Sequence, residues 1–116
     1  MGGGDTLTPH ERDEIVRAIR AGRDLTKPVA VTYFFSTQGS EPIEAEVALK
    51  EYGVNRVIID EEISGDGYWH IAAFTEVQLT APAIGYVNKE MESIAAKTRV
   101  KYDGWKVTFT VGECTT

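Results

Sequence analysis

Cysteine is almost absent from this chain, and its scarcity limits the kinds of site that the chain can build. The one thiol, Cys114, cannot form an internal disulfide, and no Cys-rich metal-binding spacing is present. The chain also has no apolar run near the ~20 residues that a membrane-spanning helix requires. Its first residues lack the basic and apolar segments of a signal peptide, so we expect a cytoplasmic protein with no membrane partner.

An excess of basic residues is absent as well. The 116 residues carry 12 Lys and Arg against 18 Asp and Glu, which gives a formal net charge of −6. Because a broad phosphate-binding surface needs clustered Lys and Arg, we expect no direct contact with nucleic acid. The acidic balance is instead compatible with binding to a basic segment of another protein.

The N-terminal part predicts a flexible leader and one helix. Residues 1–7 contain three glycines, and the segment 8–22 then begins with the spacing of a capping box. Thr8 supplies the cap, Pro9 the first helical position and Glu11 the third position after the cap. An apolar stripe at helical spacing follows, formed by Ile15, Val16 and Ile19.

The larger part of the chain, residues 28–111, predicts a single domain, with residues 112–116 as a flexible tail. The expected elements are a strand over 28–35, a helix over 41–52 capped by Ser40, strands over 54–62 and 68–79, a helix capped by Thr80, and a strand from Val100 onward. The last helix has the clearest amphipathic stripe, formed by Ile84, Val87, Met91 and Ile94.

This order of elements predicts an α+β fold. Two split strand–helix–strand units give the ferredoxin-like βαββαβ plait, a four-stranded antiparallel sheet with two helices on one face. The N-terminal helix is an addition to that plait. We expect it to cover either the open face of the sheet or an edge.

The stretch KYDGWKVTF, residues 101–109, places an Asp-Gly pair between two aromatic residues. Because glycine adopts positive φ at little cost, the pair predicts a bulge in which Gly104 has positive φ and Asp103 accepts backbone N–H bonds. The bulge would turn Trp105 onto one face of the last strand. The alternative is an exposed Trp105 that serves as a contact anchor. Catalysis by Asp103 is disfavoured, because no base or nucleophile lies near it in sequence.

A second candidate is the acidic stretch DEEISGDG, with carboxylates at Asp60, Glu61, Glu62 and Asp66. The ligand spacing of a calcium loop is missing, so we expect no metal site. On a strand, Glu61 points to the opposite face from Asp60 and Glu62. A solvated strand end is the simplest interpretation, and docking of a basic peptide is the functional one.

The two histidines, His10 and His70, have no partners at metal-ligand spacing, and we expect His70 to be half-buried in a sheet. We expect the Phe34 ring to lie on one face of the sheet. The third strand adds to that face either Tyr68, His70 and Phe74 or Trp69, Ile71 and Ala73. Stacking of RNA on such a face is disfavoured, because the RNA-recognition pattern is absent and the chain is acidic.

Three short motifs, in this order and at these distances, carry a family resemblance: DLTKP at 24–28, YFF at 33–35 and YDGW at 102–105. The helix opened by APAIGYVNKEMESIA lies between the last two. Over about residues 12–109 the chain resembles the ribonuclease E inhibitor family, the RraB-like domain.

This resemblance implies a ferredoxin-like domain with no catalytic activity of its own. The family's characterised member binds the non-catalytic, largely disordered part of ribonuclease E and restrains RNA decay. We therefore expect a non-enzymatic, protein-binding regulator that needs no cofactor. The expected contact residues are Glu61, Glu62, Asp66, Asp103 and Trp105.

Two other functions stay open. Ferredoxin-like plaits also dimerise and bind metabolites at the interface, as ACT domains do, so a small-molecule sensor is the first alternative. An enzyme is the second, and it would require a deep pocket around His70 with a neighbouring carboxylate. A homodimer is compatible with each of these functions.

Overall fold

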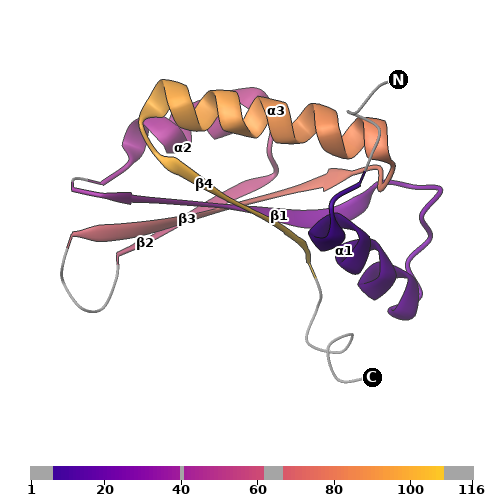
Figure 1. Ribbon diagram of the computed structural model, residues 1–116. Helices are drawn as coiled ribbons and strands as arrows, with labels where there is room; N and C mark the ends of the chain where they lie inside the picture. Colours follow the sequence, from indigo (N-terminus) through magenta and orange to yellow (C-terminus); the bar gives the residue numbers. More distant parts are fainter. Residues whose placement is uncertain (1–6, 40, 62–66, 109–116) are drawn as a thin grey trace.

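Two interleaved strand–helix–strand units form the body of the protein, and a third helix precedes them (Figure 1). The computed structural model describes residues 7–39, 41–61 and 67–108. The elements are α1 (Pro9–Arg20), β1 (Val29–Gln38), α2 (Ile43–Tyr52), β2 (Arg56–Glu61), β3 (Tyr68–Val77), α3 (Ala81–Thr98) and β4 (Lys101–Val107).

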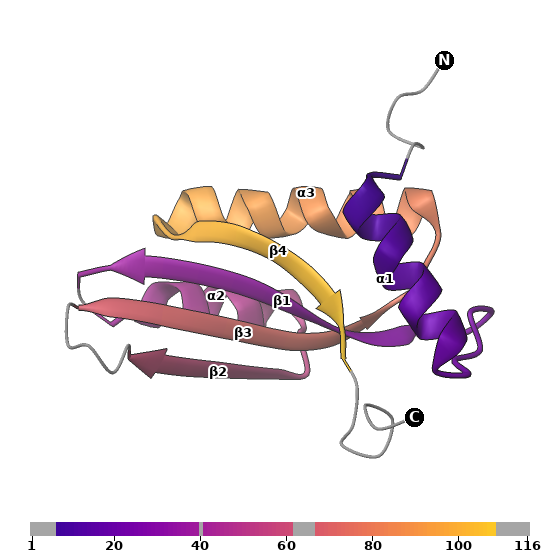
Figure 2. The same ribbon diagram turned by 60° about the horizontal axis from the view of Figure 1, so that its bottom comes forward.

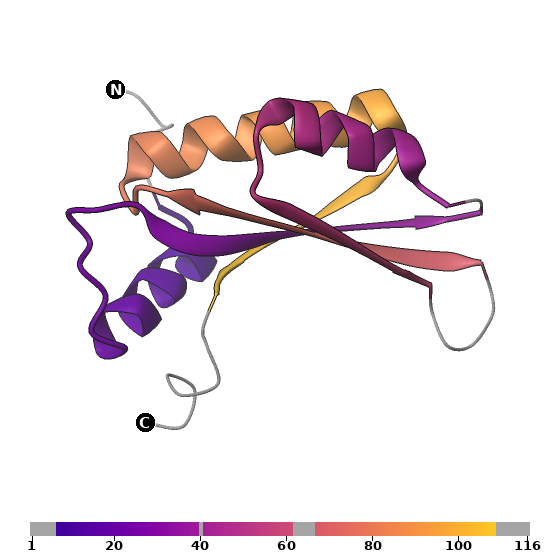
Figure 3. The same ribbon diagram turned by 180° about the vertical axis from the view of Figure 1, so that it is seen from behind.

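The four strands form one sheet in the order β2-β3-β1-β4, and every neighbouring pair is antiparallel. Strand β3 lies between the two strands joined by α2, and β1 lies between the two joined by α3. Helices α2 and α3 lie side by side over one face of the sheet (Figure 1, Figure 3). The expected α+β architecture with a four-stranded antiparallel sheet and an added N-terminal helix is therefore confirmed.

The core lies between the sheet and the helix pair α2–α3. Alternation along β1 places Val31, Tyr33 and Phe35 on the helix side, each at most 1% exposed. Leu49 of α2 and Met91 of α3 close over them at 1% and 0% exposure. Burying each such side chain contributes about 1.5–3 kcal/mol to the free energy of folding, so this layer dominates stability.

The expected stripe of α3 is confirmed, and the expected start of α2 is not. Ile84, Met91 and Ile94 are buried, and the Thr80 hydroxyl accepts a hydrogen bond from the Ala83 N–H at 3.4 Å. Helix α2 begins two residues later than expected, at Ile43, and no side chain of the described residues caps it. Ser40, the predicted cap, lies outside the described residues.

The capping box of α1 is confirmed, but the predicted apolar stripe of this helix is confirmed only at Ile15, which is half-buried and packs against the core. Val16 and Ile19 are 41% and 57% exposed, whereas Glu14 and Ala18 face inward at 3% and 0%. The physical reason is the neighbour of α1. The helix lies along a strand edge, where unpaired backbone groups need polar partners more than apolar ones.

That edge is the outer edge of β4, and α1 lies against the C-terminal end of this strand (Figure 2). Glu14 Oε1 accepts a hydrogen bond from the Val107 N–H at 2.7 Å. His10 Nε2 lies 2.7 Å from the Trp105 carbonyl oxygen; since a carbonyl only accepts, this nitrogen carries the proton. Two side chains one helical turn apart thus replace a neighbouring strand. The added helix covers an edge of the sheet.

Candidate functional site

The Asp-Gly pair of β4 forms a bulge, as predicted. Phe34 pairs with Gly104 and Phe35 pairs with Tyr102, so Asp103 is the extra residue on β4. Gly104 has a φ of 109°, which side chains other than glycine rarely adopt. Regular alternation would place residues three apart on opposite faces. The bulge lets Tyr102 and Trp105 both face the core.

Trp105 is consequently buried at 3% exposure, so the alternative in which its side chain is exposed is wrong. It pairs with Tyr33, and its ring meets His10 edge to face with centroids 5.9 Å apart. Its indole packs in the core, where it contributes to stability.

Tyr102 connects three elements through hydrogen bonds. Its ring lies 5.3 Å from that of Phe35, and burial raises the pKa of the Tyr102 phenol. The phenol O–H donates to Asn88 Oδ1 of α3 at 2.6 Å. The Asn88 side-chain nitrogen in turn donates to Glu11 Oε2 of α1 at 2.9 Å. The bulge of β4 is therefore held against both helices.

The other face of the sheet, opposite α2 and α3, is the open face. Strand pairing places Phe34 opposite Ala72, and Ala72 opposite Ile58, in one row across three strands. The next row contains Ser36, His70 and Asp60. Of the two sets that the sequence left open, Tyr68, His70 and Phe74 share the face of Phe34.

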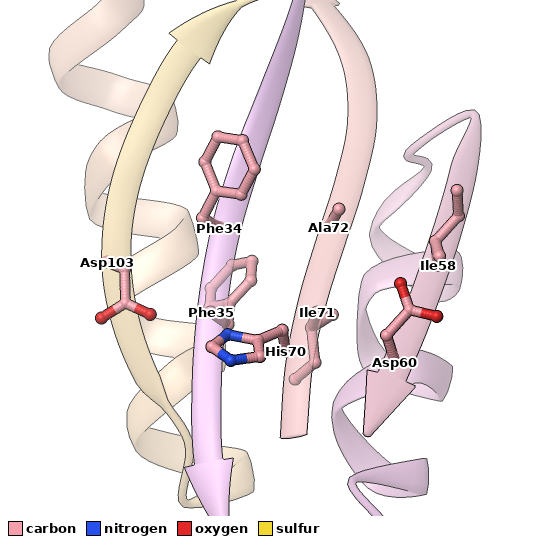
Figure 4. A pocket seen from close by; sticks show the side chains of 8 residues that line it. All are labelled: Phe34, Phe35, Ile58, Asp60, His70, Ile71, Ala72 and Asp103. Atoms are coloured by element: carbon pink, nitrogen blue, oxygen red, sulfur yellow. The ribbon is translucent and has the colours of Figure 1, made fainter. Parts of the chain in front are cut away.

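Residues of these two rows other than Ser36 line a half-open hollow of about 230 Å³ on the open face (Figure 4). The hollow is lined by Phe34, Phe35, Ile58, Asp60, His70, Ile71, Ala72 and Asp103. Its floor is apolar. The Asp60 carboxylate stands on the β2 side and the Asp103 carboxylate on the β4 side, with the His70 ring between them (Figure 4).

The predicted half-burial of His70 is wrong, because its side chain is exposed. The ring lies 5.7 Å from that of Tyr68, centroid to centroid. Asp103 lies 3.8 Å from Lys101 Nζ, and within the described residues its carboxylate accepts none of the backbone hydrogen bonds that we expected. An apolar floor between two carboxylates suits the stem and charged head of an arginine or lysine side chain.

The structure does not gather the acidic residues that the sequence singled out. Glu61 ends β2 on the helix side of the sheet, opposite Trp69, while Asp103 lies on β4 at the other edge. Glu62 and Asp66 lie outside the described residues. The residue that lines the hollow together with Asp103 is Asp60, which belongs to the acidic stretch DEEISGDG but was not among the expected contact residues. The strict alternation between Asp60 and Glu61 was the available signal.

Among residues 7–39, 41–61 and 67–108, no group of three or more His, Cys, Asp or Glu side chains is placed to hold a metal ion. No helix within these ranges has the length and apolar character to cross a membrane.

Comparison with known proteins adds one match. A family model described as regulator of ribonuclease activity B, RraB, matches residues 10–107. This range extends from the second residue of α1 to the last residue of β4, so apart from Pro9 it includes every helix and strand described above. No curated protein matches the chain.

Proposed function

The chain belongs to the regulator of ribonuclease activity B family, and we propose that it modulates RNA decay by binding a ribonuclease or the scaffold of one. The observation that carries this proposal is the extent of the family match, which includes the added helix α1 as well as the sheet. The family is a regulatory one, and we propose that this member has no catalytic activity of its own.

The proposed fold is the ferredoxin-like plait. It is supported by the two interleaved strand–helix–strand units, the strand order β2-β3-β1-β4 and the helix pair on one face. In such a plait the open face of the sheet is available to a partner. Here α1 covers the edge of β4, which leaves the hollow beside β1 accessible.

The proposed partner is a basic, disordered segment, such as the non-catalytic part of ribonuclease E. The net charge of −6 favours its approach, and the two carboxylates at the hollow can receive basic side chains. Phe34, 37% exposed, offers a ring on which a guanidinium can stack. Glu61, Glu62 and Asp66 remain proposed contacts.

Catalysis and small-molecule sensing have less support. The residues that line the hollow supply one imidazole and two carboxylates but no serine, cysteine or lysine nucleophile. The volume of about 230 Å³ is also below the roughly 300–1,000 Å³ of typical small-molecule pockets. A short peptide segment fits such a surface better, because it needs no enclosure.

Affinity capture tests the proposal. The full chain is immobilised and exposed, at low salt, to the folded host ribonuclease E and separately to its disordered part. We expect both to be retained, with retention falling steeply as salt is raised, because the attraction is electrostatic. A double variant, Asp60→Asn with Asp103→Asn, should weaken retention.

The matched control is Glu44→Gln with Glu92→Gln, which removes the same charge from exposed positions on α2 and α3. It should retain the nuclease as the unmodified chain does. If neither ribonuclease E nor its disordered part is retained at low salt, the proposed partner is wrong. If both double variants weaken retention equally, the hollow is not the contact surface.

A further inference from the structure

The two edge strands, β4 and β2, differ in whether another element covers their outer backbone groups. The outer edge of β4 carries a bulge and is covered by α1, whose side chains satisfy the Trp105 carbonyl and the Val107 N–H. Within the described residues, no element pairs with the outer edge of β2 (Figure 2). Strand β2 contains no proline and no bulge, two of the features that block an edge, and its charged residues Arg56 and Asp60 are of opposite sign.

The direction of the β2 backbone groups follows from the strand pairings. The Gly39 N–H donates to the Gly67 carbonyl at 2.7 Å. The backbone N–H and C=O groups of odd-numbered β3 residues therefore point toward β1, and those of even-numbered residues point toward β2. The Phe74 carbonyl accordingly accepts a bond from the Asn55 N–H at 2.8 Å. Arg56, Ile58 and Asp60 pair with even-numbered β3 residues. The N–H and C=O groups of Val57, Ile59 and Glu61 therefore point outward.

We propose that this edge pairs with β2 of a second copy of the chain, antiparallel, about a two-fold axis at Ile58. In this register, the outward-pointing Val57 faces the partner's Ile59, and the two exchange backbone hydrogen bonds, as do the symmetry-related residues. On the open face, Ile58 meets the partner's Ile58. Arg56 lies opposite the partner's Asp60, and the two-fold axis repeats this pair between Asp60 and the partner's Arg56.

Charge complementarity selects this register over its neighbours. Side chains that share a face repeat every two residues, so the closest alternatives centre on Val57 or Ile59. With the axis at Val57, Arg56 lies opposite the partner's Ile58. With the axis at Ile59, Asp60 lies opposite the partner's Ile58. Only the register about Ile58 pairs both charges with opposite charges, each pair contributing about 0.2–1 kcal/mol.

The second copy also contributes to the hollow. Asp60 is the carboxylate on its β2 side, and the pairing places the partner's Arg56 beside it. The two sheets become one continuous sheet whose open faces lie on the same side, because paired residues share a face. This inference concerns self-association and does not depend on the nature of any nuclease partner.

Charge reversal on the purified full chain tests the pairing, with self-association measured by sedimentation equilibrium from about 10 μM to 1 mM, the range of a small interface. Arg56→Asp and Asp60→Arg each create two like-charge pairs, so each should weaken dimerisation about tenfold. The double variant should dimerise like the unmodified chain. An equimolar mixture of the two single variants should form a heterodimer, because both of its pairs are then complementary.

The control for net charge is Glu92→Arg, an exposed α3 position that should leave dimerisation unchanged. A monomer at every concentration, or single variants that dimerise as well as the unmodified chain, would overturn the proposal. If Arg56→Asp leaves self-association unchanged but lowers nuclease capture, the edge accepts a strand from the nuclease and the proposal is also overturned. Loss of the dimer in Arg56→Asp with nuclease capture retained leaves the proposed function intact; Asp60→Arg is not used for this comparison, because Asp60 lines the hollow proposed to bind the nuclease.

Cysteine cross-linking provides a second measurement that does not depend on charge. In a Cys114→Ser background, Ile58→Cys places two thiols at the two-fold axis, where opposed Cβ atoms lie about 4.5–5.5 Å apart. Mild oxidation should then produce a covalent dimer. Ala72→Cys, on the neighbouring strand β3, should produce none. Equal cross-linking of the two variants would contradict the register.

Discussion

The Glu14 carboxylate accepts a hydrogen bond from the Val107 backbone N–H, with 2.7 Å between Oε1 and the nitrogen. The Glu14 side chain is only 4% exposed, and Arg17 Nη1 lies 3.3 Å from its second oxygen. One turn earlier, His10 bonds to the Trp105 carbonyl. A helix therefore closes the edge of a sheet with side-chain groups placed where a strand would place backbone groups.

Replacing Glu14 by alanine should destabilise the fold. The change leaves the Val107 N–H without its partner at the edge of the core, which costs about 1–3 kcal/mol of unfolding free energy in urea denaturation. Glu14→Gln retains an acceptor oxygen and should lose less. Asp13→Ala, an exposed carboxylate on the same helix, should change stability by less than about 0.5 kcal/mol. Equal losses for Glu14→Ala and Asp13→Ala would contradict the edge-capping role.

Replacing Trp105 tests whether this residue is a core residue or a contact anchor. Trp105→Ala removes a ring that is 3% exposed, so it should cost about 3–5 kcal/mol of unfolding free energy. Trp69→Ala is the matched control, because Trp69 is only half-buried and should cost less. A Trp105→Ala protein of undiminished stability that loses nuclease capture would restore the anchor interpretation.

Gly104 isolates the conformational cost of the bulge. A Cβ added at this position meets no atom within 4 Å, so Gly104→Ala is sterically free and its cost comes from the φ of 109°. We expect a loss of about 1–2 kcal/mol of unfolding free energy. Asp103→Ala, beside it, removes only a surface ion pair and should cost less than about 1 kcal/mol. An unchanged melting curve for Gly104→Ala would mean that the bulge tolerates a side chain.

Features specified by neighbouring residues could be predicted from the sequence. The capping box at Thr8 is of this kind, and so is the apolar stripe of α3. The bulge also belongs here, because two core aromatics three residues apart on a strand require an extra residue, and the Asp-Gly pair supplies it.

Features that depend on which elements meet could not be predicted in the same way. Nothing near Glu14 in sequence indicates that its neighbour is a strand edge, and the apolar spacing of Val16 and Ile19 does not show that both are exposed. That Asp60 and Asp103 line opposite sides of one hollow depends on the strand order, which places β3 and β1 between β2 and β4. Trp105 was ambiguous because tryptophan is common both in cores and at interfaces.

Stability should fall at alkaline pH. Burial raises the pKa of Tyr33 and of Tyr102 above the ordinary value of 10.0, so the folded state keeps both phenols protonated where the unfolded state loses them. Above about pH 10 the unfolded state therefore binds fewer protons, and the unfolding free energy decreases as pH rises. Below that pH the contribution is fully present. Denaturation series between pH 8 and pH 11 measure this decrease.

Tyr102→Phe identifies one source of this dependence. The variant loses the hydrogen bond to Asn88, so it should be less stable by about 1 kcal/mol at pH 8. Because it has one titrating phenol fewer, its stability should decrease less steeply above pH 10. A decrease as steep as that of the unmodified chain would assign the alkaline transition to other groups.

The open face should be required for capture of the nuclease, and the helix face should not. Phe34 and Tyr86 are aromatic residues that are 37% and 64% exposed, one on each side of the molecule. If a basic segment stacks on the Phe34 ring between Asp60 and Asp103, Phe34→Ala should weaken capture about tenfold, as loss of an aromatic hot spot does. Tyr86→Ala removes more exposed aromatic surface and should change capture little. The reverse ranking would place the nuclease on the α2–α3 side, because both variants retain the fold and the net charge, and they differ only in the face from which the ring is removed.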